Sequence, residues 1–148
     1  MATTTVQVVG RPTVNELGNR LMKVENLVDF SVAGTQTTST DVIQVLPIPK
    51  GAFVFSVGSY VHTVSTGTGD VDSVGDGADV DGWIATDLVC DLAADTNHSL
   101  PGDAYPALGG KLYTSADTID FVMKTAVNTD GKVGAWALYC IVESVALA

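Results

Sequence analysis

The sequence is poor in charged residues, in cysteine and in long apolar runs, and each shortage excludes a class of protein. Charged residues make up 16% of the 148 positions, against about 25% in an average soluble domain, so we expect part of the surface to lie against partners. The apolar runs are shorter than the roughly 20 residues of a membrane-spanning helix, and no membrane partner is expected. Cys90 and Cys140 lack metal-site spacing and fit small buried residues in a reducing compartment, with a disulfide as a minor alternative.

Basic residues are scarcest in the middle of the chain. Lys and Arg total 7 against 17 Asp and Glu, a formal net charge of −10 at pH 7, and neither basic residue occurs between Gly51 and Gly110. Since contacts with nucleic-acid phosphates depend on Lys and Arg, no nucleic-acid partner is expected. The charges balance over residues 1–50, and residues 51–148 carry the whole acidic excess. This division indicates a front part that faces a partner and an acidic remainder that faces solvent.

The residues that are plentiful predict β-structure. Val, Thr, Ile and aromatic residues recur between frequent glycines, and about eight strand candidates follow one another at the spacing of a sandwich or jelly roll. We expect an extended N-terminal arm or segment over residues 1–30 and a single all-β domain over residues 31–148, a jelly-roll-like antiparallel β-sandwich. Residues 14–28 leave helix and extended structure open, because their apolar residues have helical spacing but Gly18 weakens a helix.

Two strands carry most of the apolar residues. Residues 52–64 alternate, with Phe53, Phe55 and Val57 expected on one side and the intervening residues on the other. Residues 133–145 are apolar on both faces, with Trp136 and Leu138 sharing one of them. A strand of this kind is typical of the centre of a sheet, so we expect one face in the core and the other near a subunit interface.

The stretch DVDSVGDGADVDGW, residues 70–83, holds five aspartates and no basic residue. It fails as an EF-hand, because Val74 and Ala78 stand at loop positions 5 and 9, and position 12 is Asp81 instead of Glu. A looser calcium site formed by Asp76, Asp79 and Asp81 is a minor alternative to having no metal at all. We interpret the stretch as strand, turn and strand, with its aspartates facing solvent or a neighbouring subunit.

No motif predicts catalysis. The sequence contains no phosphate-binding loop, dinucleotide-binding glycine pattern or Cys/His metal spacing. His62 lies in a strand and His98 in a polar loop, and Ser99, next to His98, lacks the sequence context of a nucleophile elbow. We therefore expect no enzymatic activity, no catalytic or cofactor-binding residue, no cofactor and no small-molecule substrate.

Four segments carry a resemblance to a known family. IPKGAFVFSVG, VDSVGDGADVDGW, GGKLYTSADTIDFVMKT and GAWALYCIVE occur in this order, and NRLMKVENLVDFS precedes them. Together they resemble small structural proteins of tailed-bacteriophage virions, described as capsid decoration or cement proteins. The resemblance covers roughly residues 41–145 and implies β-sandwich or jelly-roll domains that assemble as trimers, without catalytic residues.

The resemblance leads to a hypothesis about function. The chain is expected to be made in the host cytoplasm and to bind the outer capsid surface of the virion as a homotrimer that clamps major capsid protein subunits. The residues expected at interfaces are Arg11, Arg20, Leu21, Lys23, Val24, Trp136 and Leu138. The alternative is a head-fibre or tail-fibre domain that contacts host glycans through Trp83 and residues 95–106.

Overall fold

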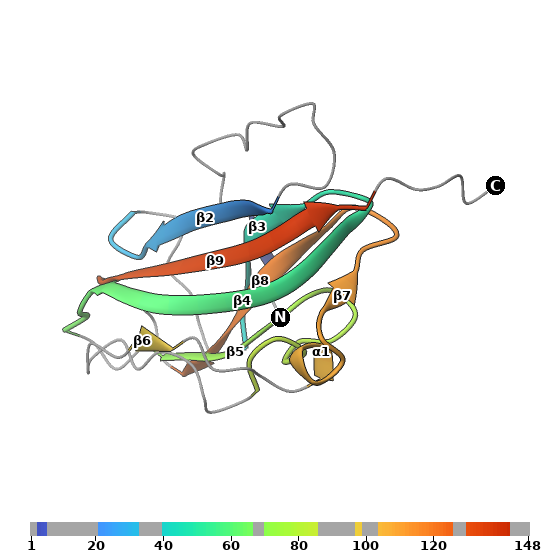
Figure 1. Cartoon of the computed structure of the whole chain (residues 1–148). Coiled ribbons are helices and arrows are strands. Elements are labelled where there is room, and N and C mark those ends of the chain that lie inside the picture. Colours follow the sequence, from blue (N-terminus) through green and yellow to red (C-terminus); the bar gives the residue numbers. More distant parts are fainter. Residues whose placement is uncertain are drawn as a thin grey trace.

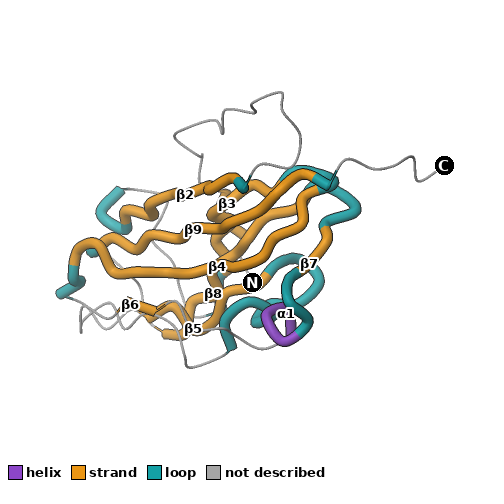
Figure 2. The backbone as a smooth tube through the Cα atoms, in the orientation of Figure 1, coloured by secondary structure: helices purple, strands orange, loops and turns teal. Residues whose placement is uncertain are grey.

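The structure is a computed structural model that describes residues 3–5, 21–32, 40–66, 70–85, 97–98, 104–125 and 130–142. Its elements are strands and one short helix, arranged as two layers (Figures 1 and 2). They are β1 (Thr3–Thr5), β2 (Met22–Asp29), β3 (Val42–Ile48), β4 (Ala52–Thr63), β5 (Asp70–Gly75), β6 (Asn97–His98), α1 (Ala104–Ala107), β7 (Lys111–Leu112), β8 (Asp117–Thr125) and β9 (Lys132–Ile141). No described helix has the length and apolar character needed to cross a membrane.

The strands form two sheets in which successive long strands alternate. Sheet A has the order β1-β3-β8-β5, and sheet B has the order β2-β9-β4-β6, with β7 also paired to β4. The pairs are antiparallel except for β1, which runs parallel to β3. From β2 to β5 the chain alternates between the sheets, with β2 and β4 in sheet B and β3 and β5 in sheet A. It alternates again from β7 in sheet B to β8 in sheet A and β9 in sheet B. This winding is that of a jelly roll and confirms the predicted all-β sandwich.

The core lies between the two sheets and is built by side chains that alternate along each strand. In β8, Ile119, Phe121 and Met123 are all buried. In β9, the buried side chains are Val133, Ala135, Ala137 and Tyr139. The strand β9 lies between β2 and β4, which confirms its predicted central position.

The expected N-terminal arm, residues 1–30, contains strand β2 of the sandwich. Met22–Asp29 is extended and pairs with β9 along its whole length, so from residue 22 onward the extended interpretation is correct and the helical one is wrong. This part of the expected arm belongs to sheet B. Residues 6–20, which include Arg11 and Arg20, lie outside the described residues.

A β-bulge changes the alternation expected in β4. The register with β9 shifts between Val54 and Ser56, which leaves Phe55 as the additional residue. After the bulge, Val57 faces the core together with Val54, while Phe53 and Phe55 lie outside it. The prediction that Phe53, Phe55 and Val57 share one side was therefore wrong for Val57, because one extra residue reverses the faces beyond it.

Candidate functional site

The acidic stretch folds as a strand followed by a tight loop. The strand β5 ends at Gly75, and after the loop Ile84 returns to form a bridge with Val74. A side chain at Gly75 would place its Cβ 2.1 Å from the carbonyl oxygen of Asp79. The backbone of the loop therefore packs directly against Gly75, where there is no room for a side chain. The expected strand and turn are confirmed. Among the described residues, the chain after the loop pairs with sheet A through this single bridge.

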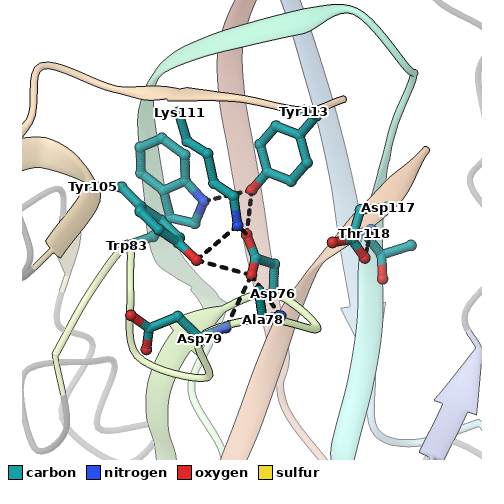
Figure 3. A network of polar contacts seen from close by, with 9 residues as sticks. All are labelled: Asp76, Ala78, Asp79, Trp83, Tyr105, Lys111, Tyr113, Asp117 and Thr118. Atoms are coloured by element: carbon teal, nitrogen blue, oxygen red, sulfur yellow. Dashed lines mark hydrogen bonds and ion pairs between the residues drawn. The ribbon is translucent and has the colours of Figure 1, made fainter. Parts of the chain in front are cut away.

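Asp76, the first residue of the loop, is the centre of a buried ionic cluster (Figure 3). Its side chain is fully buried, and both carboxylate oxygens accept hydrogen bonds. Its partners are Lys111 Nζ at 2.5 Å, Tyr113 OH at 2.7 Å and Tyr105 OH at 3.1 Å, together with the backbone N–H groups of Ala78 at 2.9 Å and Asp79 at 3.1 Å. The loop is thereby fastened to α1 and to the segment of β7.

The cluster is held together by opposite charges and shared hydrogen bonds. Burial by itself would raise the pKa of Asp76, but the hydrogen bonds from Lys111 and Tyr113 hold that pKa below its usual value. Burial acts against the charge of Lys111 too, and the hydrogen bonds with Asp76 and Tyr105 outweigh it and raise the pKa of the ammonium group. The Lys111 ammonium also lies 4.2 Å from the centre of the Tyr105 ring. Both charges of the pair are therefore maintained at neutral pH.

The position of Asp76 corrects the interpretation of the acidic stretch. We expected its aspartates to face solvent or a neighbour, but Asp76 is 1% exposed. Its carboxylate already faces the Lys111 ammonium, which supplies the compensating positive charge that a bound cation would otherwise provide. The neighbouring Asp81 carboxyl group raises the pKa of Asp79. The described residues contain no group of three or more His, Cys, Asp or Glu side chains that could hold a metal ion.

Trp83 lies behind the same cluster, and its burial counts against the glycan-binding alternative, whose other residues, 95–106, lie partly outside the described residues. Its side chain is fully buried, and its Nε1–H donates to the Tyr113 hydroxyl at 2.9 Å. Its ring also meets Tyr105 edge-on, with 5.2 Å between ring centres. A buried indole offers no face on which a sugar could stack, so Trp83 is a core residue.

The cluster has the composition of a catalytic site, but its described polar groups are paired with one another. Asp76 and Tyr113 are buried, and the Lys111 side chain keeps 20% of its surface exposed. Each polar group of the cluster is engaged by another member, so its effect is to fix the loop against sheet B. His62 is exposed, and its Nδ1 lies 3.0 Å from the Thr63 hydroxyl.

The second candidate site is the outer face of sheet B, the face turned away from sheet A. In Figure 1, β2, β9 and β4 lie in front of β3 and β8. We use the name "outer face" for the residues that the register of β2, β9, β4 and β7 places there: Lys23, Glu25, Leu27, Asp29, Phe53, Ser56, Gly58, Tyr60, Thr63, Leu112, Lys132, Gly134, Trp136, Leu138 and Cys140. Trp136, Leu138 and Cys140 are half-buried.

Two aromatic rings lie flat on glycines of this face. A Cβ at Gly58 would stand 2.4 Å from the Trp136 ring, and a Cβ at Gly134 would stand 2.2 Å from the Tyr60 ring. The Tyr60 hydroxyl donates to Glu25 Oε1 at 2.5 Å. Burial and this hydrogen bond raise the pKa of Tyr60 to about 12, so the phenol stays a donor.

The predicted interface residues divide into three groups. Lys23, Trp136 and Leu138 share the outer face, and Leu21 next to β2 is 63% exposed. Val24 is 4% exposed and points into the core, because it alternates with Lys23, and it is not available to a partner. Arg11 and Arg20 lie outside the described residues.

Gly58→Ala is expected to move Trp136 off β4, because the new methyl group would overlap its ring. The displaced indole gains contact with water, so its fluorescence emission should shift to longer wavelength, with a loss of about 1 kcal/mol in stability. Gly77→Ala is the matched control, since its Cβ would meet no atom closer than 3.5 Å. Unchanged emission in Gly58→Ala would contradict the stacked arrangement.

Comparisons with known proteins bear on the fold. No family model matches the chain, and no curated protein matches it. A chain in the "Cyanophage Pam1 capsid asymmetric unit" is 18% identical with a TM-score of 0.62, over 93% of this chain and 94% of that one. A chain in the "Capsid of Ralstonia phage GP4" is 12% identical with a TM-score of 0.64, over 97% of this chain and 100% of that one.

The fold is that of chains found in phage capsids. Both matches extend over nearly the full length of each chain, so the likeness includes the whole sandwich and is not confined to one sheet. The resemblance noted in the sequence is thus confirmed at the level of the fold. At these identities the likeness concerns architecture alone, and no residue role follows from it.

Proposed function

We propose that the chain is a structural protein of a bacteriophage virion. The observation that carries the proposal is the jelly-roll fold shared over almost the whole chain with chains of two phage capsid structures. The resemblance of four sequence segments to virion structural proteins supports it independently of that fold. The Asp76 cluster is consistent with a structural role, because its buried carboxylate is paired with Lys111 and fastens the loop.

Within the virion, we propose the role of a decoration protein. In this proposal a homotrimer binds the outer capsid surface and stabilises the shell by clamping major capsid protein subunits. The uneven charge of the chain supports this orientation, because residues 51–148 hold the acidic excess that favours solvent. The outer face of sheet B, with Trp136 and Leu138, supports contacts between subunits.

Reconstitution with expanded capsids that lack the protein tests this role. We expect the purified chain to cosediment with such capsids at saturable stoichiometry and to raise the temperature at which the shell releases its DNA, because binding to the intact state stabilises that state. Unexpanded procapsids are the control, since they present the same subunits in another arrangement. A chain that binds neither form, or that leaves the release temperature unchanged, would contradict the decoration role.

A further inference from the structure

One end of the outer face of sheet B carries a continuous apolar row. Phe53 of β4 stands opposite Cys140 of β9 on one side and opposite Leu112 of β7 on the other. Leu21, directly before β2, is placed next to the β9 end of this row, because the following residue pairs with Tyr139. The bulge residue Phe55 meets Phe53 edge-on, with 4.9 Å between ring centres.

The row stays open to contact. Leu21 is 63% exposed, Phe55 45% and Leu112 42%, and Val142, just after β9, is 42% exposed. Large apolar side chains grouped in this way on a soluble surface are typical of an interaction site.

The charged side chains of the same face cancel. Lys23 pairs with Glu25 at 2.5 Å, and Lys132 pairs with Asp29 at 2.7 Å. These four are the charged residues that the described strands contribute to the outer face, so the formal net charge of this face is zero. The whole chain, in contrast, carries a formal net charge of −10. The apolar row is therefore flanked by a neutral surface in a strongly acidic molecule.

We infer that a second copy of this chain packs against the outer face of sheet B, with the row around Phe53 and Phe55 at the centre of the contact. Copies with the same large negative charge repel each other, and the repulsion is smallest where the approaching surface is neutral and apolar. A strongly basic partner would instead be matched by an acidic face. The inference gives the proposed homotrimer a surface, and in a closed ring of three this face would meet a different surface of the next copy.

Phe55→Glu tests the inference on the isolated full chain. By sedimentation, the wild type is expected to form a closed oligomer at about 10 µM, and Phe55→Glu to raise the dissociation constant at least about tenfold. The wild-type Phe55 side chain is 45% exposed, so the monomer fold should tolerate glutamate, as circular dichroism can verify. Leu108→Glu is the matched control, because it adds the same charge at a residue that is 80% exposed and lies outside sheet B.

A spectroscopic measurement distinguishes this contact from any other. Trp83 is fully buried within one copy, so a change of tryptophan emission with concentration reports on Trp136 of the outer face. Emission should shift to shorter wavelength as the oligomer forms, in the wild type and in Leu108→Glu but not in Phe55→Glu. A wild type that stays monomeric at about 100 µM, or an oligomer equally sensitive to both variants, would overturn the inference.

Capsid binding is measured separately, so the two proposals fail in different ways. An oligomer that Phe55→Glu dissociates but that binds no capsid supports the surface inferred here and contradicts the decoration role. A monomer whose binding to expanded capsids is abolished by Phe55→Glu supports a capsid role and overturns the inference, because the outer face would then be covered by a capsid subunit.

Discussion

Lys111→Met is expected to lower the free energy of unfolding by about 3–5 kcal/mol, because it leaves the buried Asp76 carboxylate without its cation. The methionine can fill the space of the lysine stem, so the loss arises from charge and not from a cavity. Tyr113 and Tyr105 would still donate to Asp76, but neutral donors do not replace the ammonium charge. Urea denaturation measures the loss, and Lys50→Met, at an exposed lysine, gives the value for a lysine without such a partner.

The double variant Asp76→Asn/Lys111→Met separates the pair from its surroundings. It removes both charges, and replacing a whole buried pair by neutral residues is far less damaging than removing one member. We therefore expect the double variant to be more stable than Lys111→Met alone. If Lys111→Met were no more destabilising than Lys50→Met, the ion pair would not be what holds the loop.

The pairing of Asp76 with Lys111 could not be predicted from the sequence. Aspartates among glycines have the composition of a solvent-exposed turn, and that interpretation does not distinguish Asp76 from Asp79. The deciding partner, Lys111, lies 35 positions further along the chain, and only the fold brings the two together. A signal was present in the sequence, because Lys111 ends a run without basic residues that began at Gly51. A single lysine within GGKLY, two positions before Tyr113, is a candidate to pair with one specific acidic residue.

The predictions that succeeded rest on local periodicity. The two-faced apolar pattern of residues 133–145 correctly predicted that β9 lies in the centre of sheet B, with a neighbouring strand on each edge. Only one face of β9 packs against sheet A, and the other is the outer face. The same reasoning failed in β4 at the bulge beside Phe55, since alternation assumes an uninterrupted register. It also could not show that Val24 faces the core while Lys23 does not, because residues 14–28 fitted two periodicities.

Asp120 is a second buried acid, and it has no lysine opposite it. It lies in β8 of sheet A, between Gln44 of β3 and Gly75 of β5, and it is 7% exposed. Within the described part of the chain, its Oδ1 has no hydrogen-bond partner. Burial raises the pKa of Asp120 from 3.8 to about 6, and the negative charges of Asp117 and Asp76 act in the same direction. At neutral pH the folded chain therefore holds an unfavourable buried charge.

Asp120→Asn is expected to raise the free energy of unfolding at neutral pH by about 2–3 kcal/mol, because the amide has the shape of the carboxyl without its charge. The folded chain protonates Asp120 below about pH 6 and the unfolded chain only below about pH 4. Between these values the folded state binds the extra proton, so this group makes the wild type less stable as pH rises, and the full penalty remains above pH 6. Denaturation from pH 4 to 7 should show the advantage of Asp120→Asn growing across this window.

Asp29→Asn is a control of opposite sign, since hydrogen bonds from Lys132 and Ser31 lower the pKa of Asp29 to about 2, and removal of its charge should decrease stability at neutral pH. A variant Asp120→Asn that is less stable than the wild type at pH 7 would show that the Asp120 carboxylate is a favourable part of sheet A.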